Sequence, residues 1–453
     1  MKTFLLNSVF VLFCNSMLGQ GSIFITTDQA RDDINEMVKT FEEVHYNPYF
    51  KIKKEDFNQK KEQFLSEWTE DSISLKRFMV AGMKLSALMS GGHSALDWQN
   101  PKIVPELYQH KFISFTGEML DSNRFIVTKS NLTKVNEGKC VTAINDIDIK
   151  DLYKECMSYV GGIHAFKNDY CEKLFPLYLF FNETLKAPYS IKMNGSAELI
   201  KTEGMSIGEL MTFFNSNQVK SDYSFEILED NIGLISYNKC NDYEKFKIFL
   251  RSTFETIKKE SIDKLIIDIR ENGGGNSELN DLLLSYITKK PYQQSSGRYW
   301  KVSELAKSTY SGIEDFKGMF GEEFMDQYLK APNGEVIEDF NKELYSPSAP
   351  ANYFDGKSCV LIGPATFSSA NFLADAVKTY KITTLIGTAT GEYTNDFGEL
   401  LKFQLENSGN TVYISSTFDI GANGNDSILE PVFPDVEVKS DALKYAVNWI
   451  KKD

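Results

Sequence analysis

Two adjacent serines, Ser368 and Ser369, follow an apolar run and precede a stretch with helical spacing, in the sequence GPATFSSANFLADAV. A serine on a sharp turn between a buried strand and a helix can present its hydroxyl at the carboxyl end of the strand. The first N–H groups of the helix face the same point and would stabilise negative charge there. The pattern is therefore compatible with a nucleophile. The structural alternative is a helix N-cap, a common role of serine.

Three consecutive glycines end a second apolar run, in the sequence DIRENGGGN, residues 268–276. Glycine backbone can approach a ligand closely and turn its N–H groups outward. The segment is not a phosphate-binding loop, because no Gly-Lys pair followed by Ser or Thr closes it. An oxyanion hole is the better functional interpretation, and a tight strand-to-helix turn is the structural alternative.

A general base could come from a histidine, and the chain has four, of which only His93 lies in a glycine-flanked turn, ALMSGGHSAL. Neutral imidazole accepts a proton near pH 7. The long sequence separation from Ser368 is no objection, since catalytic groups are assembled in space. A purely structural histidine is the alternative. The other three histidines are His45, His110 and His164.

The segments KLIIDIRENGGGN and VLIGPATFSSANFLADAVK, the latter followed by TLIGTATGE, resemble the two signatures of the tail-specific, or C-terminal processing, serine peptidases and their tricorn-core relatives. Looser similarity extends over nearly the whole mature chain, in EVHYNPYF, SALMSGGHSAL, GKCVTAINDIDI and EPVFPDVEV. The resemblance implies an α/β multidomain fold: a crotonase-like α/β catalytic core with a helical N-terminal region and a PDZ-like middle module. It also implies an exported serine peptidase that hydrolyses peptide bonds in peptides or unfolded proteins.

The resemblance assigns Ser368 as the nucleophile. The next residue, Ser369, would give its backbone N–H to the oxyanion hole, with Gly273 or Gly274 as the other donor. Tyr393 occupies the position of the lysine base of the processing branch. A Ser/Lys dyad is thereby excluded.

The tricorn-like branch uses a histidine as base, and His93 matches it. A carboxylate should orient the imidazole, and Glu430 in ILEPVFPDVEV is the nearest match, with Glu392 as the second candidate. No metal or organic cofactor is implied.

Three positions depart from the family pattern: Asn371 replaces a glutamate, Gly91 an aspartate and Ser94 a threonine. These departures leave open a degenerate relative that binds peptides without cleaving them, since function is a property of the site and not of the fold. An α/β-hydrolase is a weaker alternative, because TFSSANF lacks the G-x-S-x-G elbow.

The chain has 453 residues and a formal net charge of −14. This length predicts two or three units. We expect a signal peptide at 1–20, a helical region at 21–100 that carries the candidate base, an α+β module at 101–222 and the catalytic core at 223–453. The acidic balance argues against a nucleic-acid partner. The oligomeric state is left open.

The first residues, MKTFLLNSVFVLFCNSMLGQGS, have the lysine and short apolar run of a signal peptide, with cleavage expected near Gly19 or Gln20. They predict export to the periplasm or the medium. No later segment has the roughly 20 apolar residues that spanning a membrane requires. Five cysteines follow Cys14 without a CxxC pattern, and free thiols are expected for them.

Overall fold

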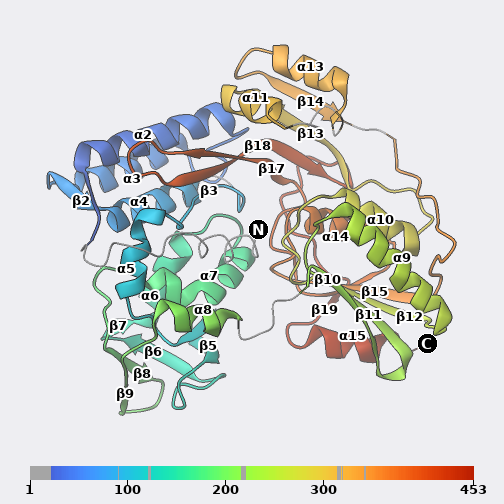
Figure 1. The fold of residues 1–453 in the computed structure, drawn as a ribbon, viewed down its shortest axis with the longest axis horizontal. Coiled ribbons are helices and arrows are strands. Elements are labelled where there is room, and N and C mark those ends of the chain that lie inside the picture. Colours follow the sequence, from blue (N-terminus) through green and yellow to red (C-terminus); the bar gives the residue numbers. More distant parts are fainter. Residues whose placement is uncertain are drawn as a thin grey trace.

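The computed structural model describes residues 22–89, 91–120, 124–215, 221–313, 318, 320–340 and 343–452. The predicted signal peptide at 1–20 lies outside these residues. Within the described part of the chain, no helix is long and apolar enough to cross a bilayer. The chain forms a mixed α/β structure with several sheets, as the resemblance implied (Figure 1).

Three helices near the N-terminus form the upper left of the molecule in Figure 1: α2 (Thr27–Val44), α3 (Lys54–Ser66) and α4 (Leu75–Leu88). Helix α2 starts at a capping box in which Thr26 and Gln29 bond each other's backbone N–H groups. Its apolar side chains recur at intervals of three and four and are buried. The strands β1 (Phe24–Thr26) and β2 (Ser72–Ser74) pair beside these helices.

An antiparallel sheet, the middle sheet, follows in the chain, with strand order β4-β5-β6-β8-β9 and β7 paired to β6. The helices around it are α5 (Val104–Gln109), α6 (Ile149–Ser158), α7 (His164–Leu179) and α8 (Ile207–Asn215). A hairpin around Gly195 joins β8 and β9. The strands are β4 (Phe115–Leu120), β5 (Arg124–Ser130), β6 (Cys140–Ile144), β7 (Ile147–Asp148), β8 (Tyr189–Met193) and β9 (Leu199–Thr202).

The core sheet has the order β10-β11-β12-β15-β16-β19, parallel except for the antiparallel pair β10 and β11. Both faces are covered: α9 (Tyr243–Lys259), α10 (Glu278–Ile287) and α14 (Ser369–Thr379) pack on one, and α15 (Ala442–Ile450) on the other. The inner residues of the central strands, 265–267 and 359–362, are therefore all apolar. The strands are β10 (Tyr223–Leu228), β11 (Ile232–Tyr237), β12 (Lys264–Asp268), β15 (Lys357–Ile362), β16 (Thr384–Gly387) and β19 (Val436–Glu437).

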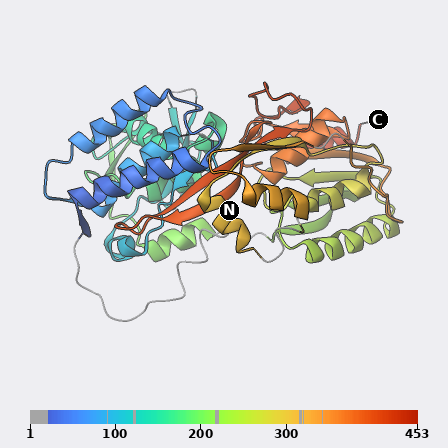
Figure 2. The same ribbon diagram turned by 90° about the horizontal axis from the view of Figure 1, so that it is seen from above.

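A second antiparallel sheet, β14-β13-β18-β17, connects the core to the N-terminal helices. Figures 1 and 2 show β17 (Asp396–Gln404) and β18 (Thr411–Gly421) running from one lobe to the other. Val412 and Tyr413, at the start of β18, pair with β3 (Ala95–Leu96), which directly follows the turn of His93. This pairing fixes that turn beside the core sheet although about 270 residues separate it from Ser368. The remaining elements are β13 (Ser295–Lys301), α11 (Glu304–Ser311), α13 (Glu322–Lys330) and β14 (Val336–Phe340).

Candidate active site

The turn between β15 and α14 carries the two serines. Ser368 has φ 54° and ψ −129°, a conformation that L-residues other than glycine rarely adopt, and it is half-buried. Such a conformation costs on the order of 1–3 kcal/mol and persists only where the surroundings impose it. Ser368 occupies the N-cap position, yet its hydroxyl makes no capping hydrogen bond. The hydroxyl at 368 is therefore not used to cap the helix.

The glycine loop after β12 holds the serine turn. The Phe367 N–H donates to the Asn272 carbonyl oxygen at 3.0 Å, and the Ser369 hydroxyl donates to the Gly275 carbonyl oxygen at 2.6 Å. The amide of Asn280 on α10 donates to the Ser369 carbonyl oxygen at 2.7 Å. Since both loops leave the carboxyl ends of neighbouring parallel strands, these bonds fix them against each other.

Gly274 is the point of closest approach between the two loops. Its φ is +93°, and a Cβ at this position would lie 2.6 Å from Ser368 Cβ and 2.9 Å from the Ser369 nitrogen. Only glycine fits there. The Gly274 N–H donates to Asn272 Oδ1 at 2.9 Å. Among the described residues, the N–H groups of Gly273 and Ser369 have no hydrogen-bond partner, so they are free to bind an oxyanion.

His93 is buried and its ring packs against Phe367, the residue before Ser368, with ring centroids 4.6 Å apart. Gly92 permits this contact, because a Cβ there would lie 2.9 Å from Phe367 Cζ. The fold thus places the glycine-flanked histidine directly on the serine turn.

Glu392, on the connection between β16 and β17, contacts both His93 and the backbone of Ser368. Its Oε1 lies 3.3 Å from His93 Nδ1, and its Oε2 accepts a hydrogen bond from the Ser368 backbone N–H. The His93 contact is close but not aligned as a hydrogen bond, so Nδ1 is a buried atom without such a bond among the described residues. One buried carboxyl group therefore links the imidazole to the backbone of the serine turn.

Glu430, the first carboxylate candidate from the sequence, is placed differently. Its side chain is exposed, and its backbone carbonyl oxygen accepts the Thr394 N–H at 2.9 Å. The structure brings the second candidate, Glu392, against His93 instead. Sequence comparison could not separate the two, because the fold of the β16–β17 connection decides which carboxylate points inward.

Two of the three departures from the family pattern have a local explanation. Asn371 is buried and donates its amide to the Tyr393 carbonyl oxygen at 2.7 Å, which ties α14 to the segment of Glu392. Gly91 lies against Asp396: a Cβ at 91 would be 2.6 Å from Asp396 Oδ1. A side chain at 91 would collide with this carboxyl group. The third departure, Ser94, has no structural explanation. Its hydroxyl accepts the Ser415 N–H of β18 at 3.2 Å.

Burial dominates the electrostatics of the site. Burial lowers the pKa of His93 to about 4. Burial, and after it the charge of Asp396, raises the pKa of Glu392 well above its usual value. Burial likewise raises the pKa of Asp396 to about 6. Burial therefore favours the uncharged form of both groups, the neutral imidazole of His93 and the protonated carboxyl group of Glu392.

The other histidines lie in different surroundings. His45 is buried, accepts the Asn47 N–H at Nδ1 and packs on Phe397. His110 packs on Phe112 and Phe180. Among the described residues, no group of three or more His, Cys, Asp or Glu side chains has the arrangement of a metal site.

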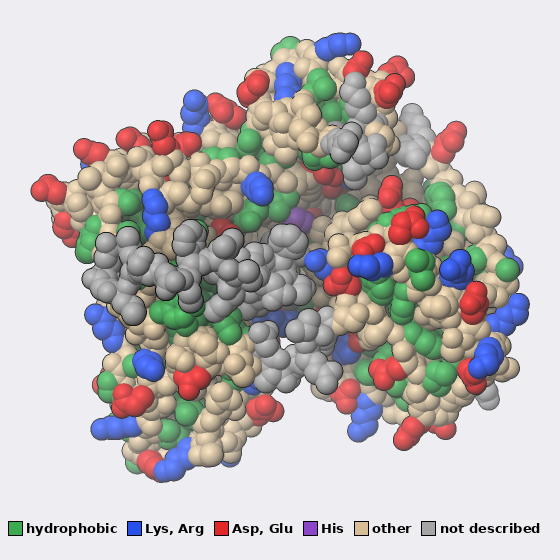
Figure 3. Space-filling view, viewed as in Figure 1, with side chains coloured by type: hydrophobic (Ala, Val, Ile, Leu, Met, Phe, Trp, Pro, Cys, Tyr) green, Lys and Arg blue, Asp and Glu red, His purple; other side chains and the backbone are tan. Residues whose placement is uncertain are grey.

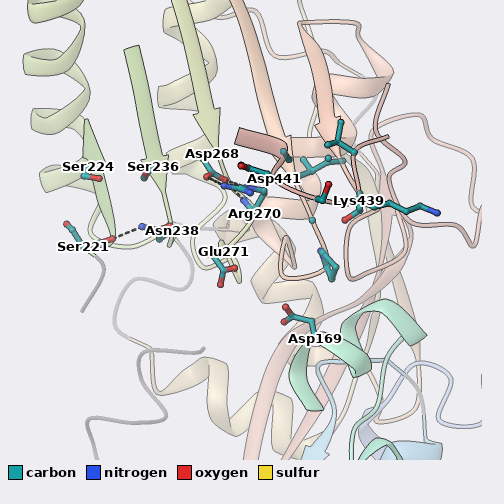
Figure 4. Close-up of a pocket in the computed structure, with 18 residues that line it drawn as sticks. Asp169, Ser221, Ser224, Ser236, Asn238, Asp268, Arg270, Glu271, Lys439 and Asp441 are labelled. Carbon is teal, nitrogen blue, oxygen red and sulfur yellow. Dashed lines mark hydrogen bonds and ion pairs between the residues drawn. The ribbon is translucent and has the colours of Figure 1, made fainter. Parts of the chain in front are cut away.

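A polar cleft of about 800 Å³ lies next to the two loops, at the carboxyl ends of the core strands (Figure 4). Arg270 lines it and pairs with Asp268 at 2.7 Å, and Asp169 of α7 faces it from the middle sheet's side. Neither Ser368 nor His93 is among its lining residues. The cleft is therefore adjacent to the candidate site and distinct from it. Over the face of the molecule drawn in Figure 3, acidic and basic side chains are intermixed.

A mostly parallel sheet thus carries a strained serine, a glycine loop and a buried histidine at its carboxyl edge, an arrangement compatible with a serine hydrolase. Residues 231–438 match the model of Peptidase family S41, and this match supports a serine peptidase. A comparison with curated protein sequences finds no match.

Solved structures of CPAF have a similar fold. A CPAF mutant aligns with a TM-score of 0.65 at 13% identity, covering 94% of this chain and 96% of that one. Mature CPAF complexed with lactacystin aligns with a TM-score of 0.61 at 13% identity, covering 93% and 97%. At this identity the likeness concerns the fold, and it extends over the helical region and the middle sheet as well as the core.

Proposed function

We propose that the chain is a serine peptidase that uses Ser368 as nucleophile, His93 as general base and Glu392 to orient and charge-stabilise the imidazole. The observation that carries the proposal is the position of Glu392, whose two oxygens contact His93 Nδ1 and the Ser368 N–H. Two features of Ser368 support the nucleophile assignment: its strained backbone, and a hydroxyl that makes no capping hydrogen bond to the helix.

The proposed reaction is acyl transfer through Ser368. His93 takes the Ser368 hydroxyl proton as Oγ attacks the peptide carbonyl carbon, and the tetrahedral oxyanion binds backbone N–H groups of the serine turn and glycine loop. His93 then protonates the leaving amine, and water hydrolyses the acyl-enzyme by the reverse roles. Ser369 and Gly273 are the proposed oxyanion donors, because their N–H groups have no partner among the described residues. The Gly274 N–H would have to leave Asn272 to take part.

Peptides and unfolded protein segments are the proposed substrates, and the polar cleft beside the glycine loop is a proposed path for the substrate chain. The proposed units are those predicted from the sequence, with the core at 223–453. Export after removal of residues 1–20 is also proposed. N-terminal sequencing of protein recovered from the periplasm or medium should begin near Gln20 or Gly21, and an intact Met1 on that material would contradict export.

Covalent labelling tests the mechanism. A fluorophosphonate probe should label the wild type, and peptide mapping should locate the adduct on Ser368. Ser368→Ala should abolish labelling and cleavage of a diverse peptide library, whereas Ser369→Ala keeps the backbone N–H and should retain both. A folded wild type that binds peptides but shows neither labelling nor cleavage would instead identify a degenerate, peptide-binding relative.

A further inference from the structure

The side chain of Phe166, on α7 beside the middle sheet, lies against a neighbour of each of the three proposed catalytic residues. Its ring stacks on Phe367, next to Ser368, with centroids 4.6 Å apart and planes inclined by 24°. A Cβ at Gly92, next to His93, would lie 3.2 Å from Phe166 Cε1. A Cβ at Gly391, next to Glu392, would lie 3.3 Å from Phe166 Cβ.

These contacts belong to a continuous column of rings. The His93 ring packs on Phe367, Phe367 stacks on Phe166, and Phe166 stacks on Tyr170 one helical turn further along α7, with centroids 5.5 Å apart. Phe166 is buried, with 7% of its surface exposed. Because interiors are close-packed, a ring in this position restricts the rings on both sides of it. The imidazole therefore has a support that originates outside the catalytic core.

The backbone before α7 adds a second contact with the histidine turn. A Cβ at Gly161 would lie 2.7 Å from the Gly91 carbonyl oxygen, and one at Gly162 would lie 3.2 Å from the Gly92 Cα. Lys51 donates its ammonium group to the Gly162 carbonyl oxygen at 2.8 Å. Two glycine segments thus meet backbone to backbone, without a side chain between them.

We propose that Phe166 is a positioning residue, which holds the serine, histidine and glutamate turns in their reactive arrangement. The inference rests on the proposed function of these turns. Phe166 acts through Phe367, Gly92 and Gly391. It makes the geometry of the site depend on the placement of α7, which Figure 1 shows on the side of the middle sheet that faces the core.

The test compares Phe166→Leu with Phe175→Leu, the same change on the same helix. Phe175 is also buried, but it packs on Phe115 and Phe125 in the interior of the middle module. For each variant kcat, KM, the rate of fluorophosphonate labelling and the melting temperature are measured. Phe166→Leu should lower kcat and the labelling rate by about 10- to 100-fold, because small misplacements of reacting groups have effects of this size. Its KM should change by less than about threefold, since the catalytic step is affected more than binding.

Phe175→Leu should lower the melting temperature at least as much and leave kcat near that of the wild type. Phe166→Tyr keeps the ring and should restore most of the activity. If Phe166→Leu does not fold, Gly161→Ala, which presses one methyl group on the Gly91 carbonyl, should produce the same selective loss of kcat.

Three results would overturn the inference. The first is that the wild type is active and Phe166→Leu folds with an unchanged kcat. Where Gly161→Ala replaces that variant, an unchanged kcat in folded Gly161→Ala counts in the same way. The second is an equal loss of kcat in Phe175→Leu. The third is a wild type that the probe does not label at all, and only this result would overturn the proposed function as well.

Discussion

The Nδ1 atom of His93 lies 3.3 Å from Oε1 of Glu392, and both side chains are buried. The other oxygen of the same carboxyl group accepts the Ser368 N–H. An ionised carboxyl group in this position would stabilise the imidazolium that forms when His93 takes a proton. Because the site is shielded from water, this interaction is stronger than it would be at the surface.

Glu392→Gln should therefore lower kcat by on the order of 10²- to 10⁴-fold while the chain stays folded, since the amide keeps the size of the side chain but not its charge. Glu430→Gln is the matched control, because its side chain is exposed and should tolerate the change. Steady-state kinetics on both variants give the comparison. A larger loss in Glu430→Gln than in Glu392→Gln would return the carboxylate role to Glu430.

The pH dependence of kcat should report the protonation of the pair. Burial raises the pKa of Glu392 well above its usual value, while burial lowers that of His93 to about 4. The active form has an ionised Glu392 and a neutral His93, so activity should be lost as pH falls through the raised pKa of the carboxyl group. In Glu392→Gln no carboxyl group titrates at this position, and the acid limb should move down towards the pKa of His93. An acid limb at the same pH in both proteins would show that another group controls it.

Gly274→Ala and Gly273→Ala test the contact between the two loops. Gly274 has φ +93° and no room for a Cβ beside Ser368, whereas a Cβ at Gly273 meets nothing within 4 Å. Gly274→Ala should displace the serine turn and reduce kcat by more than about 100-fold, with a lower melting temperature. Gly273→Ala retains its N–H and should stay within about threefold of the wild type. Equal kinetics for the two variants would argue against a tight fit between the loops.

Local patterns in the sequence predict most of the elements that carry the site. The buried run Leu265, Ile266 and Ile267 forms β12, and the glycines and serines after β12 and β15 meet at one sheet edge because parallel strands end there together. The region from 292 to 353 contains the strands β13 and β14 as well as helices. Strand β13 pairs with β18, more than a hundred residues away, and β14 pairs with β13. No local pattern reports the pairing with β18.

Within the site, the residue types were predictable and their partners were not. The glycine-flanked turn singles out His93, and its contact with Phe367 depends on β3 pairing with β18. The choice of Glu392 over Glu430 at the imidazole depends on how the chain returns from β16 to β17. Phe166 gives no signal at all, because an apolar residue at helical spacing is ordinarily a core residue.

Buried carboxyl groups should also make the folded state sensitive to pH. Burial raises the pKa of Asp396 from 3.8 to about 6, so the protein binds this proton more tightly when it is folded. The resulting contribution to stability is fully present below about pH 4 and is lost as pH rises through about 6.

Asp396→Asn cannot ionise, and its amide oxygen can still accept the Phe397 N–H that Asp396 Oδ1 accepts at 2.8 Å. The free energy of unfolding of the wild type should therefore fall between pH 4.5 and pH 7.5. That of Asp396→Asn should fall by roughly 1–3 kcal/mol less over the same range. Urea unfolding at both pH values measures the difference, with the exposed Asp56→Asn as control. The same pH dependence in the wild type and Asp396→Asn would contradict the prediction and show that Asp396 is ionised without cost in the folded chain.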